Sequence, residues 1–265
     1  MRIVVAYKWT RDPEEATVGA DGTVDWSRAK PGLSTYDPGA MELARQLAEA
    51  TGAELIGVTA GGKGVAAPIA SKAALARGLD RVVIVEDEAL AGAGQGELAA
   101  VLAEVIRHIG DVDLVITGDS SVDVAAKMVP TVLAGELGWP AVAEVAAVSG
   151  TGVRAGALRV ERAIPGGVQV LEVSGPAVLA ASADAAVPRV AGMKELLAAA
   201  KKPVERLDLA ALKVPSGAVM TVTGRSRPER KARKGQLIDT TDPAAAAAEL
   251  VTALREAGPL EGNRP

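Results

Sequence analysis

Apolar runs of strand length alternate with helical segments through the first 140 residues, and this rhythm restricts the fold more than any other feature. The four runs are rich in β-branched residues at successive positions, which is typical of strands buried on both faces. They are RIVVAY (2–7), ELIGVTA (54–60), RVVIVED (81–87) and DLVITG (113–118). Between them, 38–52, 67–80 and 95–110 carry apolar residues at helical spacing and a glycine at or near the end. This alternation predicts a doubly wound α/β fold around a mostly parallel sheet.

Residues 141 to 182 follow a different pattern. Apolar residues recur at every second position around two turns, Gly-Thr-Gly at 150–152 and Pro-Gly-Gly at 165–167. Alternation with a period of two around glycine-rich turns is typical of β-hairpins. We therefore expect antiparallel hairpin strands added to the same sheet.

The regular rhythm stops near residue 184. One helix is predicted at 193–202, ending in paired lysines, and another near the C-terminus, where Thr241 or Asp242 caps a helix with Pro243 in its first turn. The basic stretch at 225–234 lacks aromatic residues, and the whole chain is acidic. This stretch is therefore interpreted as a solvated or partner-facing linker rather than a nucleic-acid patch.

The residue types that are missing exclude several kinds of chemistry. With no cysteine and one histidine, the chain can form no disulfide, no thiolate metal site and no zinc site of His and Cys ligands. A Ser-His-Asp triad could use only His108, which lies at the predicted end of a helix, where it complements the helix dipole. The net charge is −4 and the apolar runs are short. We therefore expect a cytoplasmic protein that neither binds nucleic acid nor inserts into a membrane.

Ligands of parallel sheets bind beyond the carboxyl ends of the strands, where helix N-termini present unpaired N–H groups. Four segments of this sequence are expected at such ends or beside them: Ala6–Lys8, 59–67, Gly118–Val129 and the loop Ser34–Asp37 that enters a helix. Their hydroxyls and small residues would let phosphate or ribose approach the backbone closely. The sequence therefore offers four candidate ligand-binding segments.

The residues by themselves leave two interpretations of Gly118–Val129 open. Its acidic and hydroxyl side chains either cap the following helix or help to hold a phosphate. Residues 62–67 match the pattern GxGxxA, but no acidic residue closes a strand at the distance of the dinucleotide pattern. No Walker lysine, pair of catalytic carboxylates or activated nucleophile is visible. The pattern favours a nucleotide-holding domain without a catalytic set.

The order of segments resembles the β subunit of the electron transfer flavoproteins over nearly the full length. The most specific stretches are VERAIPGGVQVLEVSGPAVLAAS (160–182) and VPRVAGMKELLAAAKK (187–202). They are similar to the family signature of a strand, a Gly-Gly turn, a strand ending in Pro-Ala-Val, then Pro-Arg and a helix ending in lysines. ASKAALARGLDRVVIV (70–85) and RKARKGQLIDTTDPAAAAAELVTALREAG (230–258) resemble two further family segments.

The resemblance implies an electron carrier subunit rather than an enzyme. In this family an α subunit carries most contacts to a redox-active FAD, and the β subunit holds AMP, or a second FAD in electron-bifurcating members. Electrons would come from FAD-dependent dehydrogenases and leave to a quinone-reducing or other acceptor. The implied domains are a nucleotide-binding α/β domain (1–184, with hairpin strands 141–182), a partner-recognition loop and helix (185–214), and a C-terminal arm and helix packing on the α subunit (215–265).

Matched to the family motifs, the implied nucleotide site falls on the candidate segments. Its residues are Ala6, Ser34, Thr35, Tyr36, Asp37, Ala60, Gly118, Asp119, Ser120, Ser121, Val122, Asp123, Val124, Ala125, Ala126, Lys127, Met128 and Val129. Met193 occupies the apolar position through which the family docks partner dehydrogenases. Many members read GKQAIDDDxxQ where this chain reads GDSSVDVAAKM, so Asp119 replaces a lysine.

Two other functions are consistent with a nucleotide-holding α/β domain. The first is a stand-alone, universal-stress-type protein that binds an adenine nucleotide as a homodimer. The long segment after residue 184 argues against it, because that fold would end near residue 140. The second is an adenylating enzyme of the pyrophosphatase type, which the incomplete loop AGGKGV (60–65) disfavours.

Overall fold

The computed structural model describes residues 1–19, 21–152, 157–215, 223 and 235–258. By their internal contacts the residues fall into two units, Met1–Val222 and Thr223–Pro265. The first unit contains the sheet and the helices packed on it. The second contains one described helix, and each unit is considered by itself below.

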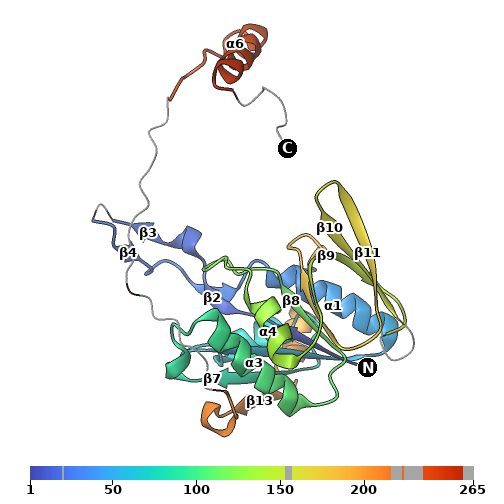
Figure 1. The fold of residues 1–265 in the computed structure, drawn as a ribbon. Coiled ribbons are helices and arrows are strands. Elements are labelled where there is room, and N and C mark those ends of the chain that lie inside the picture. Colours follow the sequence, from blue (N-terminus) through green and yellow to red (C-terminus); the bar gives the residue numbers. More distant parts are fainter. Residues whose placement is uncertain (20, 153–156, 216–222, 224–234, 259–265) are drawn as a thin grey trace. The chain divides into compact units, whose positions relative to one another are not determined.

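Nine strands form one sheet in the described part of the first unit, in the order β11-β10-β9-β12-β8-β1-β6-β7-β13 (Figure 1). Their bounds are β1 Arg2–Ala6, β6 Glu54–Gly61, β7 Arg81–Glu86, β8 Leu114–Gly118, β9 Ala141–Ser149, β10 Leu158–Ile164, β11 Gly167–Val173, β12 Ala177–Ala181 and β13 Val204–Leu207. In this sheet order, each strand from β9 through β12, β8, β1, β6 and β7 to β13 pairs in parallel with the next. The pairs β9 with β10 and β10 with β11 are antiparallel. The predicted doubly wound α/β fold with added antiparallel strands is confirmed.

Strand β12 differs from the hairpin strands among which it was predicted. It lies between β8 and β9 and runs parallel to both. All five of its residues are buried. An uninterrupted apolar run is typical of a parallel strand covered on both faces, so the sequence Ala177–Ala181 carried the signal that the hairpin interpretation overlooked.

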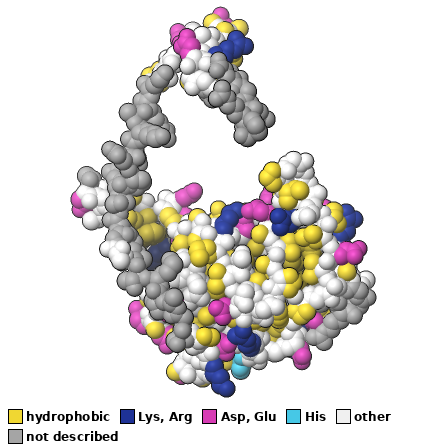
Figure 2. All heavy atoms as spheres, in the orientation of Figure 1, with side chains coloured by type: hydrophobic (Ala, Val, Ile, Leu, Met, Phe, Trp, Pro, Cys, Tyr) yellow, Lys and Arg dark blue, Asp and Glu magenta, His cyan; other side chains and the backbone are white. Residues whose placement is uncertain are grey.

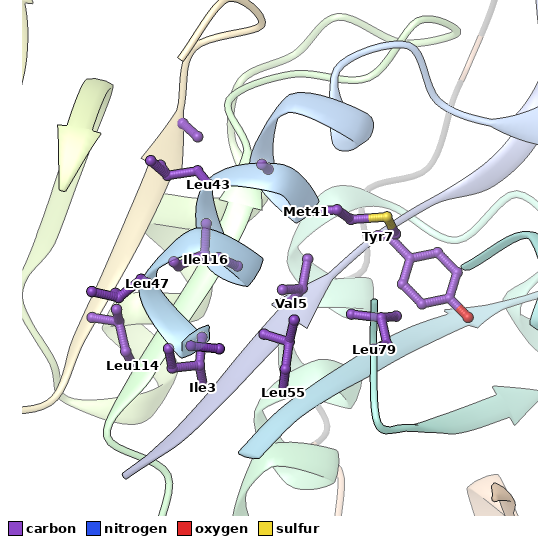
Figure 3. Close-up of a cluster of buried hydrophobic side chains, with 14 of the residues drawn as sticks. Ile3, Val5, Tyr7, Met41, Leu43, Leu47, Leu55, Leu79, Leu114 and Ile116 are labelled. Carbon is purple, nitrogen blue, oxygen red and sulfur yellow. The ribbon is translucent and has the colours of Figure 1, made fainter. Parts of the chain in front are cut away.

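Helices cover both faces of the sheet. On one face α1 (Asp37–Thr51) and α2 (Pro68–Leu75) pack against the first hydrophobic cluster. Figure 3 shows Val5 of β1 in this cluster near Met41 of α1, and Ile3 of β1 beside Leu47 of the same helix. On the other face α3 (Gln95–Ile109) and α4 (Val129–Leu137) pack against the second cluster. These layers bury the apolar surface of both strand faces.

The chain reverses its direction of winding at β1. After β1 it adds β6 and β7 on one side, and it then returns to place β8 on the other side, with Ala6 paired to Thr117. The helices after these strands leave toward opposite faces, so a crevice opens between the carboxyl ends of β1 and β8.

Short elements follow β1 before the first helix. Two pairs of short strands are formed by β2 (Trp9–Arg11) with β5 (Pro31–Leu33) and by β3 (Thr17–Val18) with β4 (Val24–Asp25). The 3-10 helix η1 (Pro13–Glu15) lies in the same segment, whereas η2 (Glu88–Leu90) follows β7 and η3 (Leu209–Ala211) follows β13. The pairing of β2 with β5 brings the loop before α1 back beside the end of β1.

The helix predicted at 193–202 is α5 (Met193–Ala199), which is shorter than expected. Its last lysine, Lys202, precedes Pro203 and points its ammonium to the carbonyl oxygens of Leu75 and Leu79. A residue before proline is disfavoured in helical conformation, which explains the early end. The chain then forms the edge strand β13.

The second unit contains α6 (Pro243–Glu256). The Asp242 carboxylate accepts hydrogen bonds from the backbone N–H groups of Ala244 and Ala245, and Pro243 lies in the first turn. Of the two predicted caps, Asp242 is therefore the one used. None of the helix residues is buried within this chain. The basic stretch at 225–234 lies outside the described residues.

Candidate functional site

A cavity of about 130 Å³ opens at the carboxyl edge of the sheet, at the reversal point between β1 and β8. Its walls come from the ends of these strands, the loop after β8, and the first turns of α3 and α4. The predicted site residues in these walls are Ala6, Asp37, Ala60, Gly118, Asp119, Ser120, Ser121, Val124, Ala126, Lys127, Met128 and Val129. Strand ends that are far apart in sequence thus meet at one cavity.

A second, more open cavity of about 440 Å³ adjoins the first, because Ser121 lines both. It is bounded by η1, the loop before α1 and the loop after β8. Its lining residues are Asp12, Pro13, Glu14, Thr35, Tyr36, Ser121, Val122, Ala125 and Ala183. The predicted residues Thr35, Tyr36, Val122 and Ala125 line this second cavity and not the first.

Two predicted residues, Ser34 and Asp123, line neither cavity but join the loops that do. The Ser34 hydroxyl accepts a hydrogen bond from the backbone N–H of Val122 at 3.2 Å. The Asp123 carboxylate pairs with the Lys8 ammonium, with Nζ 2.7 Å from Oδ2, and accepts a hydrogen bond from the Thr10 hydroxyl at 3.0 Å. These contacts hold the loop after β8 against the end of β1 and the loop before α1.

Asp37 is the buried centre of this junction. Its carboxylate accepts a hydrogen bond from the backbone N–H of Lys8 at 2.7 Å. Burial raises the pKa of Asp37 to about 7, although hydrogen bonds from Lys8 and Gly118 and the charge of Lys8 oppose this rise. Burial would also raise the pKa of Asp123, but Lys8, Ser121 and Thr10 bring it below its ordinary value.

Gly118 permits the close contact between β8 and the start of α1. A Cβ atom at this position would lie 2.8 Å from Oδ1 of Asp37 and 3.0 Å from the backbone oxygen of Tyr36. No larger residue fits without moving the Tyr36–Asp37 turn. The glycine is therefore required by packing at the boundary of the two cavities.

The loop after β8 does not cap the helix that follows it. That helix, α4, begins only at Val129, and no side chain accepts a hydrogen bond from its first turn. Asp119 instead pairs with Lys127, and Asp123 pairs with Lys8. The helix-cap interpretation of this loop is therefore wrong. The backbone departs from regular structure within it, since Ala125 and Lys127 have φ values of +53° and +52°.

The glycine-rich loop after β6 is occupied by a side chain of the protein itself. Oε2 of Glu86, at the end of β7, accepts hydrogen bonds from the backbone N–H groups of Gly64 and Ala66 at 2.9 and 2.8 Å. Of the predicted residues beside this loop, Ala60 lines the first cavity. The GxGxxA match therefore marks a turn closed by a carboxylate rather than an open phosphate site.

Several residues of the first cavity are absent from the predicted set. They include Ala93, Gln95, Leu98 and Leu102 in and before α3, and Thr117 and Pro130. Tyr7 and Lys8 also line the cavity; they belong to the candidate segment Ala6–Lys8 but not to the implied nucleotide site. Helix α3 follows β7, and no side chain caps its first turn. The rule that located the other segments, a helix N-terminus after a parallel strand, would also have located Gln95.

Met193 lies at the first position of α5, and 73% of its surface is exposed. Val187, Val190 and Leu197 of the same segment are also largely exposed. The preceding loop is tied to α1, because the Arg189 guanidinium lies 3.7 Å from carboxylate oxygens of Glu42 and Glu49. This segment thus presents apolar side chains on an anchored loop.

His108 is in the last turn of α3, as the sequence suggested, and its Nε2 atom lies 2.8 Å from a carboxylate oxygen of Glu205 on β13. It lines neither cavity.

Among the described residues, no group of three or more His, Asp or Glu side chains could hold a metal ion. No described helix is long and apolar enough to cross a membrane. Basic and acidic side chains are interspersed over the face shown in Figure 2.

A comparison with known families agrees with this geometry. The family model described as the electron transfer flavoprotein domain matches residues 22–212. The matched region contains the loop before α1, the loop after β8, all four helices on the sheet and the segment around Met193. Proteins of this kind carry electrons in association with flavins. The match covers well over half of the chain, which therefore belongs to the electron transfer flavoprotein family.

Proposed function

We propose that this chain is the β subunit of a heterodimeric electron transfer flavoprotein in the cytoplasm. It accepts electrons from FAD-dependent dehydrogenases and passes them to a quinone-reducing acceptor, through an FAD held mainly by the α subunit. FAD supplies the redox chemistry. The chain itself supplies a nucleotide site and docking surfaces, and it is not an enzyme. The family match over residues 22–212 carries this proposal.

The first cavity is the proposed site for AMP, or for a second FAD if the pair bifurcates electrons. Small and apolar side chains, among them Ala60 and Leu102, would contact the base. The uncapped first turns of α3 and α4 leave backbone N–H groups for a phosphate. The cavity therefore combines an apolar wall with backbone donors, which suits a nucleotide.

The remaining predicted residues act through the loops they join. Lys8, Asp37 and Asp123 connect three of the four segments, so they would keep the nucleotide site in shape. Tyr36 lines the second cavity, which adjoins the first at Ser121 and is bounded by Asp12 and Glu14. In this proposal the nucleotide has a structural role and the chain transfers no protons.

Partner contacts are assigned to two regions. Met193, with the exposed apolar residues around it, is the proposed anchor for FAD-dependent dehydrogenases, because a flexible thioether side chain adapts to different surfaces. Helix α6 buries none of its residues within this chain, and Leu250 and Val251 remain exposed. A helix of this kind gains stability by packing on another surface, which we assign to the α subunit.

The test is to co-express the full chain with the product of a neighbouring gene that resembles an α subunit. The expected product is a stable heterodimer that shows flavin absorbance and is reduced by an FAD-dependent dehydrogenase. Mass analysis of the nucleotides released on denaturation would distinguish AMP from a second FAD. A purified pair with neither flavin nor adenine nucleotide would contradict the proposal.

The universal-stress-type homodimer and the pyrophosphatase-type enzyme are not favoured by the family match. The homodimer predicts that the chain alone binds an adenine nucleotide and self-associates without flavin. Sedimentation of the chain with and without the α subunit separates the two assemblies. A heterodimer that forms at the expense of any homodimer would support the electron carrier.

A further inference from the structure

We propose that Asp119 is a specificity-determining residue of the first cavity, whose free carboxylate oxygen accepts a hydrogen bond from a neutral O–H or N–H donor of the bound nucleoside. The inference rests on the nucleotide site proposed above and assigns a role within it.

The two oxygens of the Asp119 carboxylate have different surroundings. Asp119 lines the cavity, and only 6% of its surface is exposed. Its Oδ2 atom lies 2.8 Å from the Lys127 ammonium. Its Oδ1 atom is buried and has no hydrogen-bond partner among the residues that the structure describes. One oxygen is therefore paired, and the other lacks a donor.

Two donors at Asp119 in the described part of the chain are already engaged. The Lys127 ammonium is shared between Asp119 and Glu144, whose Oε1 atom lies 2.9 Å away. The backbone N–H of Asp119 is bonded to the carbonyl oxygen of Ala181 at 2.9 Å. An ionised oxygen that is buried without a donor is costly, so a donor at this position is expected from outside the chain.

The charge of Asp119 determines which part of a nucleotide it can accept. A phosphate group carries between one and two negative charges near neutral pH and would be repelled by the carboxylate. Ribose hydroxyls and the exocyclic amine of adenine are neutral donors. We therefore assign the nucleoside end of the ligand to Asp119 and the phosphate to the uncapped helix turns.

The experiment measures the affinity of the full chain for AMP, adenosine and inorganic phosphate by calorimetric titration. Asp119→Ala is expected to weaken AMP and adenosine at least about tenfold, which is typical of losing a hydrogen bond to a charged group, and to leave phosphate unchanged. Glu144→Gln is the matched control, because Glu144 lines neither cavity and the change removes only the second partner of the Lys127 ammonium, leaving both oxygens of Asp119 in place. Its expected effect on adenosine is less than about threefold.

Analogues locate the donor. Each of three analogues lacks one donor of adenosine: 2′-deoxyadenosine, 3′-deoxyadenosine and purine riboside. The wild-type chain should bind one of them more weakly than adenosine. Asp119→Ala should bind that analogue and adenosine with equal affinity. If the alanine variant does not fold, Asp119→Asn is compared with the wild-type chain: it keeps a neutral acceptor oxygen and should bind AMP and adenosine, but more weakly than the charged carboxylate does. Equal losses in Asp119→Ala and Glu144→Gln, or no analogue whose loss is coupled to Asp119, would overturn the inference.

The titration separates this inference from the proposed function. A chain that binds adenosine through Asp119 but forms no flavin-containing pair would uphold the residue assignment and contradict the electron carrier. A flavin-containing pair in which Asp119→Ala changes only thermal stability would uphold the electron carrier. In that case the free oxygen would have a structural role, and the assignment would be wrong.

Discussion

The loops after β6 and β8 lie at the carboxyl edge of the sheet, and both are rich in small residues. They differ in whether another part of the protein already binds their backbone N–H groups. After β6, the N–H groups of Gly64 and Ala66 bind the carboxylate of Glu86. After β8, the loop leads to α4, whose first turn has no side-chain cap and lines a cavity. The first loop thus already holds an anionic group of the protein, and the second is open to a ligand. Small residues after a strand make a binding site only where the protein leaves the donors free.

The largest expected effect comes from Gly118→Ala, which would remove the geometry of the open loop. The new Cβ would lie 2.8 Å from the Asp37 carboxylate and 3.0 Å from the oxygen of Tyr36. We expect a loss of about 3 kcal/mol in the free energy of unfolding, together with loss of bound nucleotide. Denaturant titration and nucleotide analysis provide the measurements. Gly135→Ala, with no atom within 4 Å of the new Cβ, is the control and should not destabilise the chain.

The next prediction concerns the two carboxylates that Lys8 contacts beside the open loop. The pKa of Asp37 is raised to about 7, so its contribution to stability is complete below pH ~4 and is lost as the pH rises through 7. From pH 5 to pH 8 the wild-type chain should lose on the order of 2 kcal/mol relative to Asp37→Asn. The measurement is denaturant unfolding of both proteins at each pH.

Asp123 provides the control for this pH dependence. Its pKa is lowered, so its contribution is present above pH ~4 and is lost as the pH falls below that value. Asp123→Asn should therefore keep most of the difference between pH 5 and pH 8, since the charge of Asp123 is the smallest of the causes that act on the pKa of Asp37. If Asp37→Asn and the wild-type chain lost stability in parallel over this range, the assignment to Asp37 would be refuted.

Glu86→Ala would convert the closed loop into an open one. Removing the carboxylate leaves the N–H groups of Gly64 and Ala66 without their partner, at an expected cost of about 1 kcal/mol in stability. Inorganic phosphate should then raise the melting temperature of the variant more than that of the wild-type chain. Glu86→Gln keeps an acceptor and should resemble the wild-type chain. An equal phosphate response in all three proteins would show that the loop holds no anion.

The smallest expected effect belongs to the hydroxyls of the open loop. If backbone N–H groups hold the nucleotide, the double change Ser120→Ala and Ser121→Ala should weaken AMP less than about threefold. Equilibrium binding to the full chain measures this. A loss of tenfold or more in AMP affinity would show that the serine hydroxyls bind the nucleotide. The result would show whether the open loop, like the closed one, binds its ligand through backbone N–H groups.

The sequence predicted the parts of the fold that depend on local periodicity. The apolar runs around Val4, Val58 and Val115 and the helical segments between them became β1, β6, β8 and their covering helices. Asp242 and Pro243 placed the start of α6. The direction of β12 was missed, although its continuous apolar run indicated a parallel strand. These features depend on which residues are buried, and the spacing of apolar residues within a short segment indicates which ones they are.

The candidate site was predictable in outline, because strand ends of a parallel sheet meet at one edge. The division of its residues between two cavities was not predictable, nor was the late start of α4 at Val129. The resemblance named Asp119 as a site residue, but only the structure shows that one of its oxygens lacks a partner.

The sequence by itself therefore determined most strands of the sheet, their covering helices and the segments that gather at the edge. The tertiary structure decided which of those segments can bind a ligand. Glu86 reaches a loop 20 residues away, and Lys8 reaches Asp123 across 115 residues. Hydrogen-bond partners at such separations depend on how distant elements pack, whereas burial follows from local pattern. That is why the closed and the open loop could be told apart only in three dimensions.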